Sequence, residues 1–239
     1  MISSSFTLLT STTTDLNKKL SIVEGEIVKS SVAYMSKGTY ETITVNGPEE
    51  LNVFLDNLKS NQAVSIGVCN KGASGKIKSK KSKQKGAVCR TKDNFDPSNC
   101  FIFDLDDSDL GIDQVIPTLC EIDPNLKNAD ILVRVSSSYG VHKTGEQPNL
   151  DSCGYHVWVL GVKEPKDIAR YGKDFAKRCW LKGFGKIIIS ASGAMLERQL
   201  IDAAVFSPER LVFEAKPTLG DGLEQLERLY IIQRGNCYV

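Results

Sequence analysis

Residues 101–107 read Phe-Ile-Phe-Asp-Leu-Asp-Asp, a short apolar run that ends in acidic residues. Side chains alternate between the two faces of a β-strand, so a strand over residues 100–106 would point Asp104 and Asp106 to the same side. Two neighbouring carboxylates repel each other, and a divalent cation offsets that repulsion directly. The pattern therefore predicts a strand that carries two metal ligands. An isolated acidic pair can also mark a strand that simply ends in solvent.

The chain beyond this stretch alternates between strand and helix patterns. We expect strands at residues 131–135, 155–160, 187–189 and 211–213, and helices at residues 113–121 and 165–181. Pro117 is expected to kink or shorten the first of these helices. The order β-α-β-β-α-β is that of ferredoxin-like and RRM-like split βαβ folds. The predicted class is α+β, with an RRM-like module at residues 99–239.

Residues 1–98 form the predicted N-terminal α/β half. The first twenty residues are rich in Ser and Thr and are expected to be loosely ordered. Pro48 begins a predicted helix at residues 48–59, and a buried strand is expected at residues 63–68.

A basic segment closes this half of the chain. Residues 71–92 contain nine Lys and Arg residues and no acid, and three glycines interrupt any helix. The segment predicts a mobile basic loop that contacts a nucleic-acid backbone, although a solvated lysine run remains the simple alternative. The candidate nucleic-acid contacts are Lys78, Lys80, Lys81, Lys83 and Arg90.

Composition excludes several classes of protein. The 239 residues include 30 Lys and Arg against 29 Asp and Glu, and a net charge of +1 excludes a uniformly basic protein. No apolar run approaches ~18 residues, so no transmembrane helix is expected, and the N-terminus lacks the pattern of a secretory signal. Seven cysteines without a C-x-x-C pair favour a reducing cytoplasm over a disulfide framework or a zinc ribbon.

Further polar residues stand in apolar or hydroxyl-rich surroundings. His156 lies inside an apolar predicted strand, and Ser138 belongs to a turn of three serines. Asp202 is a lone acid in an apolar stretch, with Arg198 before it and Arg210 after it. Histidine, serine and arginine beside a metal-bound carboxylate pair would suit a triphosphate. A core histidine and ordinary surface ion pairs are the structural alternatives.

Together these residues resemble the archaeo-eukaryotic primase superfamily, especially the primase-polymerases of phages, plasmids and integrated elements. The resemblance covers roughly residues 60–215. The superfamily has a D-x-D/E strand, an s-x-H or G-x-H strand and a later acid, which match Asp104 with Asp106, then His156, then Asp202. One departure is Gly154, because many members have a serine two residues before the histidine.

The resemblance implies an RRM-like catalytic half packed against the N-terminal α/β half, with template and nucleotide between them. It implies template-directed nucleotide transfer with two divalent ions, Mg²⁺ or Mn²⁺, held by Asp104, Asp106 and Asp202. Residues that would bind the nucleotide are Ser138, His156, Arg198 and Arg210. Expected partners are single-stranded DNA, a primer, dNTPs or NTPs, and a replicative helicase, either separate or on a longer parent chain. The expected location is a prokaryotic cytoplasm, with a phage or plasmid as a possible source of the gene, and no membrane partner is expected.

Two other classes of function stay open. A metal-dependent nuclease also needs clustered carboxylates, but it has less need of a triphosphate clamp. A non-catalytic RRM-like domain would present aromatic residues on its sheet for base stacking, where this chain has acids and a histidine.

Overall fold

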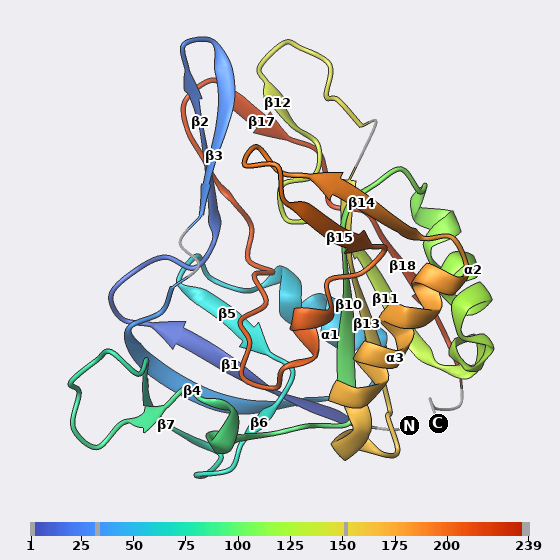
Figure 1. Cartoon of the computed structure of the whole chain (residues 1–239). Helices are drawn as coiled ribbons and strands as arrows, with labels where there is room; N and C mark the ends of the chain where they lie inside the picture. Colours follow the sequence, from blue (N-terminus) through green and yellow to red (C-terminus); the bar gives the residue numbers. More distant parts are fainter. Residues whose placement is uncertain (1–2, 32–33, 151–152, 236–239) are drawn as a thin grey trace.

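The computed structural model describes residues 3–31, 34–150 and 153–235 of the chain (Figure 1). Within that part, three α-helices and several β-sheets give a mixed α+β fold, which confirms the predicted class. None of the helices in these described ranges is long and apolar enough to cross a membrane.

A four-stranded sheet with the order β10-β13-β11-β18 carries Asp104, Asp106 and His156. All its neighbouring strands are antiparallel, so β10 and β11 run parallel to each other with β13 between them. Helix α2 connects β10 to β11, and this arrangement is the predicted split βαβ unit. The bounds are β10 Cys100–Ser108, α2 Ile112–Ile122, β11 Asp130–Val135, β13 Cys153–Leu160 and β18 Tyr230–Gln233.

The fourth strand of this sheet differs from the prediction. The strand expected at residues 187–189 is β14 (Gly185–Ile189), and it pairs with β15 (Met195–Gln199) in a separate hairpin. The strand β10 lies at the edge of the sheet, and the segment at Asp202 runs along that edge. The backbone N–H of Asp202 donates to the Asp104 carbonyl over 2.8 Å. The strand expected at residues 211–213 is also reduced to a single bridge between Val212 and Val64.

Helices α2 and α3 (Ile168–Leu181) cover one face of the four-stranded sheet (Figure 1). Phe101 and Phe103 point to this face, and the Phe103 ring lies 4.6 Å from the Phe175 ring of α3. Because side chains alternate along a strand, Ile102 and Asp104 project from the opposite face. Helix α2 continues through Pro117, so the expected shortening does not occur.

The N-terminal half contains a five-stranded sheet with the order β5-β1-β4-β7-β8. Its central region is built on β1, which pairs with both β4 and β5. The expectation that the first twenty residues are loosely ordered is therefore wrong, because β1 is hydrogen-bonded on both sides and its Phe6 and Leu9 side chains are fully buried. The bounds are β1 Ser4–Ser11, β4 Lys37–Val45, β5 Gln62–Ser65, β7 Ser74–Lys78 and β8 Val88–Cys89.

The basic segment at residues 71–92 is not a loop throughout. Strand β7 pairs with β4, and β8 runs parallel to β7 at the edge of the sheet. Ile77 is buried and anchors β7 to the core. The exposed lysines Lys80, Lys81 and Lys83 lie between the two strands. The glycines thus exclude a helix as expected, but the alternation around Ile77 supports a strand.

One hydrophobic core includes residues from both predicted halves. Helix α1 (Pro48–Asp56) contacts both β4 and β11, and the Phe6 ring lies 5.9 Å from the Trp158 ring of β13. Short strands complete the fold, namely β2 Lys18–Val23, β3 Glu26–Ser31, β6 Val68–Cys69, β9 Phe95–Asp96, β12 Val141–Lys143, β16 Thr218–Leu219 and β17 Leu223–Gln225.

Candidate active site

Three polar residues lie in one row across the four-stranded sheet. Asp104 of β10 is opposite His156 of β13, and His156 is opposite Arg134 of β11. Directly opposite residues project from the same face of a sheet. This row therefore lies on the face that the helices α2 and α3 leave uncovered.

Asp104 and Asp106 line one cavity of about 190 Å³, which we call the active-site cavity. The register of β10 against β13 shifts between Leu105 and Ser108, so the strand bulges next to Asp106. Ser136, His156 and Arg210 line the same cavity. The structure thus brings together residues that are separated by more than 100 positions in the sequence.

The environment of Asp104 favours a bound cation. Burial raises the pKa of the Asp104 carboxyl, and the charges of Asp106 and Asp202 raise it further, while His156 and Lys18 act in the opposite direction. A divalent cation between the carboxylates would relieve this repulsion. Asp104 and Asp106 therefore fit the role of cation ligands.

Asp202 lies beside Asp104, but its carboxylate is engaged elsewhere. Its Oδ1 accepts from the Ala204 N–H over 2.8 Å, and its Oδ2 lies 3.4 Å from Nη2 of Arg210. Across the described ranges, no group of three His, Cys, Asp or Glu side chains stands ready to hold a metal ion. For Asp202 to become a third ligand, its carboxylate would have to leave Arg210 and Ala204.

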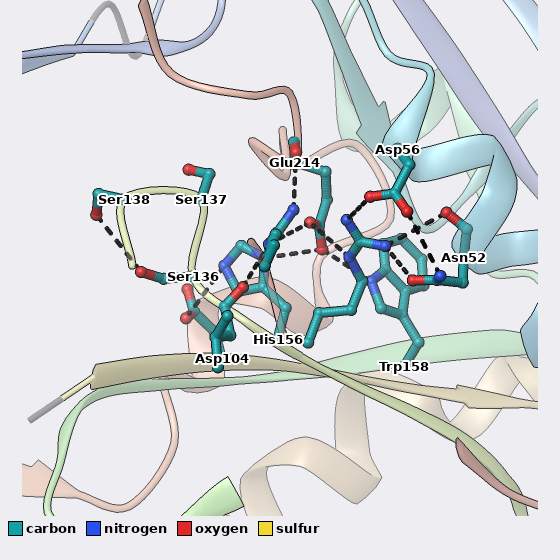
Figure 2. A network of polar contacts seen from close by, with 12 residues as sticks. Asn52, Asp56, Asp104, Ser136, Ser137, Ser138, His156, Trp158 and Glu214 are labelled. Carbon is teal, nitrogen blue, oxygen red and sulfur yellow. Dashed lines mark hydrogen bonds and ion pairs between the residues drawn. The ribbon is translucent and has the colours of Figure 1, made fainter. Parts of the chain in front are cut away.

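His156 is held between two carboxylates (Figure 2). Its Nδ1 lies 2.9 Å from Oε1 of Glu214, and its Nε2 lies 3.6 Å from Oδ1 of Asp104. An ionised carboxylate can only accept hydrogen bonds, so Nδ1 carries a proton and donates a hydrogen bond to Glu214. This contact fixes the orientation of the ring and turns Nε2 towards the active-site cavity.

Glu214 is the centre of a buried polar network. Its side chain is fully buried and accepts from Nη2 of Arg228 over 2.6 Å and from Nε1 of Trp158 over 3.0 Å. Nε of Arg134 lies 3.6 Å from its Oε2. Burial alone would raise the pKa of Glu214, but Arg228, His156 and Arg134 hold it well below its usual value. Glu214 is therefore ionised at neutral pH.

The network continues into the N-terminal half, where it reaches Asp56 and Asn52 (Figure 2). Nη2 of Arg134 lies 2.6 Å from Oδ1 of Asp56, and Nη1 donates to the Asn52 side chain. Asp56 and Asn52 both belong to α1. A continuous set of polar contacts thus joins α1 to Asp104 by way of Arg134, Glu214 and His156.

Arg134 and Glu214 have no predicted role, although each leaves a signal in the sequence. Arg134 interrupts an apolar strand, Ile-Leu-Val-Arg-Val, and Glu214 interrupts the apolar run Leu-Val-Phe-Glu-Ala. A charged residue in such surroundings needs a partner when it is buried. Their pairing could not be found from local patterns, because 80 positions separate the two residues.

Lys18 and Lys29 of the β2–β3 hairpin also lie at the site. Both line the active-site cavity and an adjoining cavity of about 170 Å³, which contains Asp106, Ser136 and Ser138 as well. Nζ of Lys18 lies 3.3 Å from Oγ of Ser138. Neither lysine stands in a recognisable motif, so their place at the site follows from the tertiary fold alone.

Gly154 lies at the point where the two cavities join. A Cβ at this position would lie 3.0 Å from the Leu105 carbonyl oxygen, which is closer than ordinary van der Waals contact. A serine here would need the bulge in β10 to move. Ser136 lies next to Gly154 and lines both cavities, so a hydroxyl is present from the neighbouring strand end.

The other predicted site residues lie farther from these carboxylates. Arg198 is exposed on β15, outside the linings of both cavities, and donates to the carbonyl of its neighbour Glu197. Arg90 is half-buried, and its Nη1 donates to the Glu209 carbonyl over 2.8 Å. Nζ of Lys78 donates to the Gln84 carbonyl over 2.8 Å. The basic segment therefore presents mainly the exposed lysines between β7 and β8 to a ligand.

Comparisons with protein-family models, with curated proteins and with solved structures find no match to this chain. The case for a function therefore depends on the arrangement of the chain's own residues.

Proposed function

We propose that this chain is a template-dependent nucleotidyltransferase, a DNA primase or primase-polymerase that uses two divalent cations, Mg²⁺ or Mn²⁺. One observation carries the proposal: Asp104 and Asp106 share a cavity with His156, Lys18 and Arg210. Carboxylates suit divalent cations, and cationic side chains suit phosphate oxygens. A site for nucleoside triphosphates needs both kinds of group within a few ångströms.

The residues would divide the work as follows. Asp104 and Asp106 would hold the cations, and Asp202 would be a third ligand if its carboxylate left Arg210. Bound there, the cations supply Lewis acidity that lowers the pKa of an attacking hydroxyl and offsets charge on the leaving pyrophosphate. Arg210 binds phosphate oxygens through its planar guanidinium, and Ser136 and Ser138 supply hydroxyl donors.

His156 would act as a fixed donor. Glu214 accepts the hydrogen bond from Nδ1 and fixes the ring, so Nε2 faces the cavity and, in the imidazolium form, would donate to a phosphate oxygen bound there. A preoriented donor needs no reorganisation when charge develops on that oxygen. The buried network behind Glu214 keeps this orientation in place.

The proposed partners are a single-stranded DNA template, a primer, dNTPs or NTPs, and a replicative helicase. The proposed location is a prokaryotic cytoplasm, and the gene would belong to a phage, plasmid or integrated element, in keeping with the primase-like motifs. The six described cysteines are all free, which suits a reducing compartment.

Arg210 separates this proposal from a metal-dependent nuclease. Arg210→Ala should raise the KM for the nucleotide at least about tenfold, because it removes a charged phosphate contact. Arg170→Ala is the matched control, since Arg170 is an exposed arginine on α3. Initial rates over a nucleotide titration give both values. Shortening of the template without nucleotides, unaffected by Arg210→Ala, would favour the nuclease.

The exposed lysines should contribute to binding of the template. Replacing Lys78, Lys80, Lys81 and Lys83 together by Ala should weaken binding to single-stranded DNA and flatten its salt dependence. The slope of log K against log salt should fall by up to about 0.7 for each lysine that contacts a phosphate. Fluorescence anisotropy at several salt concentrations measures this slope. An unchanged slope would show that the lysines are merely solvated.

A further inference from the structure

The β2–β3 hairpin contributes two lysines, Lys18 and Lys29, to the active-site cavity that Asp104 and Asp106 also line. In the hairpin register Leu20 is opposite Lys29, so Lys18 and Lys29 lie diagonally on one face. Both line the active-site cavity and the adjoining cavity. Lys19 projects from the other face of β2 and pairs with Asp15 over 2.9 Å. The two inward lysines are thus distinguished from their neighbour by geometry.

The base of this hairpin is anchored to the chain that follows Glu214. Strand β16 runs parallel to β2, with Thr218 opposite Lys19. Just before β2, the buried side chain of Asn17 donates to the Lys216 carbonyl over 2.7 Å and to the Thr218 hydroxyl over 2.9 Å. The backbone around Lys18 is therefore fixed before a ligand binds, which lowers the entropic cost of binding.

The surroundings of Lys18 favour an anion. Burial lowers the pKa of its ammonium group to about 8, and the positive charges of Lys29 and Arg228 contribute to this shift. Asp104 and Asp106 oppose it only in part. Once cations neutralise those two carboxylates, the charge of the lysines would need another anion to offset it. A phosphate group would be such an anion.

The dimensions of the site favour a short polyphosphate over a nucleic-acid strand. The two cavities that the lysines line have volumes of about 190 and 170 Å³, and hydroxyls of Ser136 and Ser138 complete their polar lining. Lys80, Lys81 and Lys83 offer an exposed basic surface elsewhere. A nucleic-acid strand can therefore bind at this exposed surface, while the cavity has room for a few phosphate groups.

We propose that Lys18 and Lys29 form a binding pair for the triphosphate tail of the nucleotide, supplied by the N-terminal half of the chain. This inference rests on the proposed function, since it names residues that would hold that enzyme's substrate. The hairpin would thus act together with Arg210, which lines the same cavity.

Isothermal titration with inorganic tripolyphosphate, with Mg²⁺ present, tests the pair without any turnover. The variant Lys18→Met/Lys29→Met should bind tripolyphosphate at least about tenfold more weakly than the wild type, because charged contacts to phosphate are lost. Lys19→Met should bind as the wild type does. Lys29 is exposed, so Lys29→Met alone carries the test if the double variant does not fold. Binding of a single-stranded thymidine oligonucleotide should stay unchanged in all variants.

Two outcomes would overturn the inference. One is equal affinity of the wild type and the double variant for tripolyphosphate. The other is a loss of oligonucleotide binding as large as the loss of tripolyphosphate binding, which would assign the lysines to a DNA backbone. Failure of the proposed function would look different, because tripolyphosphate binding would depend on the two lysines although the wild type incorporates no nucleotide.

Discussion

Asp104→Ala and Asp106→Ala should each reduce nucleotide incorporation by at least about 10³-fold. Each change removes a carboxylate from the cation site, and the charge stabilisation that a catalytic metal supplies amounts to several kcal/mol. Primer extension with labelled nucleotides, in Mg²⁺ and separately in Mn²⁺, measures the effect. Either variant extending a primer at the wild-type rate would contradict the assignment of the cation site.

Loss of the Asp104 carboxylate should leave the fold intact. Because burial raises the pKa of Asp104, the fold disfavours its ionised form, and stability falls as the pH rises through the raised pKa. A neutral side chain at position 104 removes this cost at neutral pH. Asp104→Asn should therefore melt at the same temperature as the wild type or higher. A lower Tm would show that Asp104 supports the fold rather than a cation.

Glu214→Ala should destabilise the protein by about 3–5 kcal/mol, since it leaves Arg228 buried without its counter-ion and leaves Arg134 with Asp56 alone. For a chain of this size the loss corresponds to a fall in Tm of about 6–20 °C. Glu227→Ala is the control, because Glu227 is an exposed acid next to Arg228 and surface changes cost little. Thermal melts followed by circular dichroism measure both.

The pH dependence of the protein's stability tests separately whether Glu214 is ionised in the fold. Its pKa lies well below the ordinary value of 4.5 in the fold, so the unfolded state binds more protons in acid. The stabilisation is present above pH 4.5 and is lost as the pH falls through the lowered pKa. The difference in stability between the wild type and Glu214→Gln should therefore shrink as the pH is lowered. A constant difference between pH 7 and pH 3 would contradict an ionised Glu214.

Local patterns predicted the elements that bury one clear face. The strand β10, the helix α3 and the helix α1 have apolar residues at the spacing that their periods require, and these elements form close to the expected residues. The fourth strand could not be predicted in the same way. Residues 187–189 and residues 230–233 are both short apolar runs, and only the packing of the whole chain decides which of them joins the sheet.

Some residues of the candidate site could be predicted from local patterns, and others could not. Asp104, Asp106 and His156 stand out because they interrupt apolar strands, and neighbouring strands bring them together. Lys18 stands in an ordinary polar segment, and only the return of the chain at β16 holds it over the site. Glu214 stands beside a predicted strand that is a single bridge in the structure, so strand geometry could not give its direction.

Nucleotide incorporation on single-stranded DNA, with and without a primer, tests the proposed activity most directly. The assay uses labelled dNTPs and NTPs with Mg²⁺ or Mn²⁺, and Asp104→Ala/Asp106→Ala serves as the control. The proposal predicts metal-dependent products that are absent with the control, and products without a primer would make the enzyme a primase. An unchanged template and no products under any of these conditions, or a template that is only shortened, would contradict it.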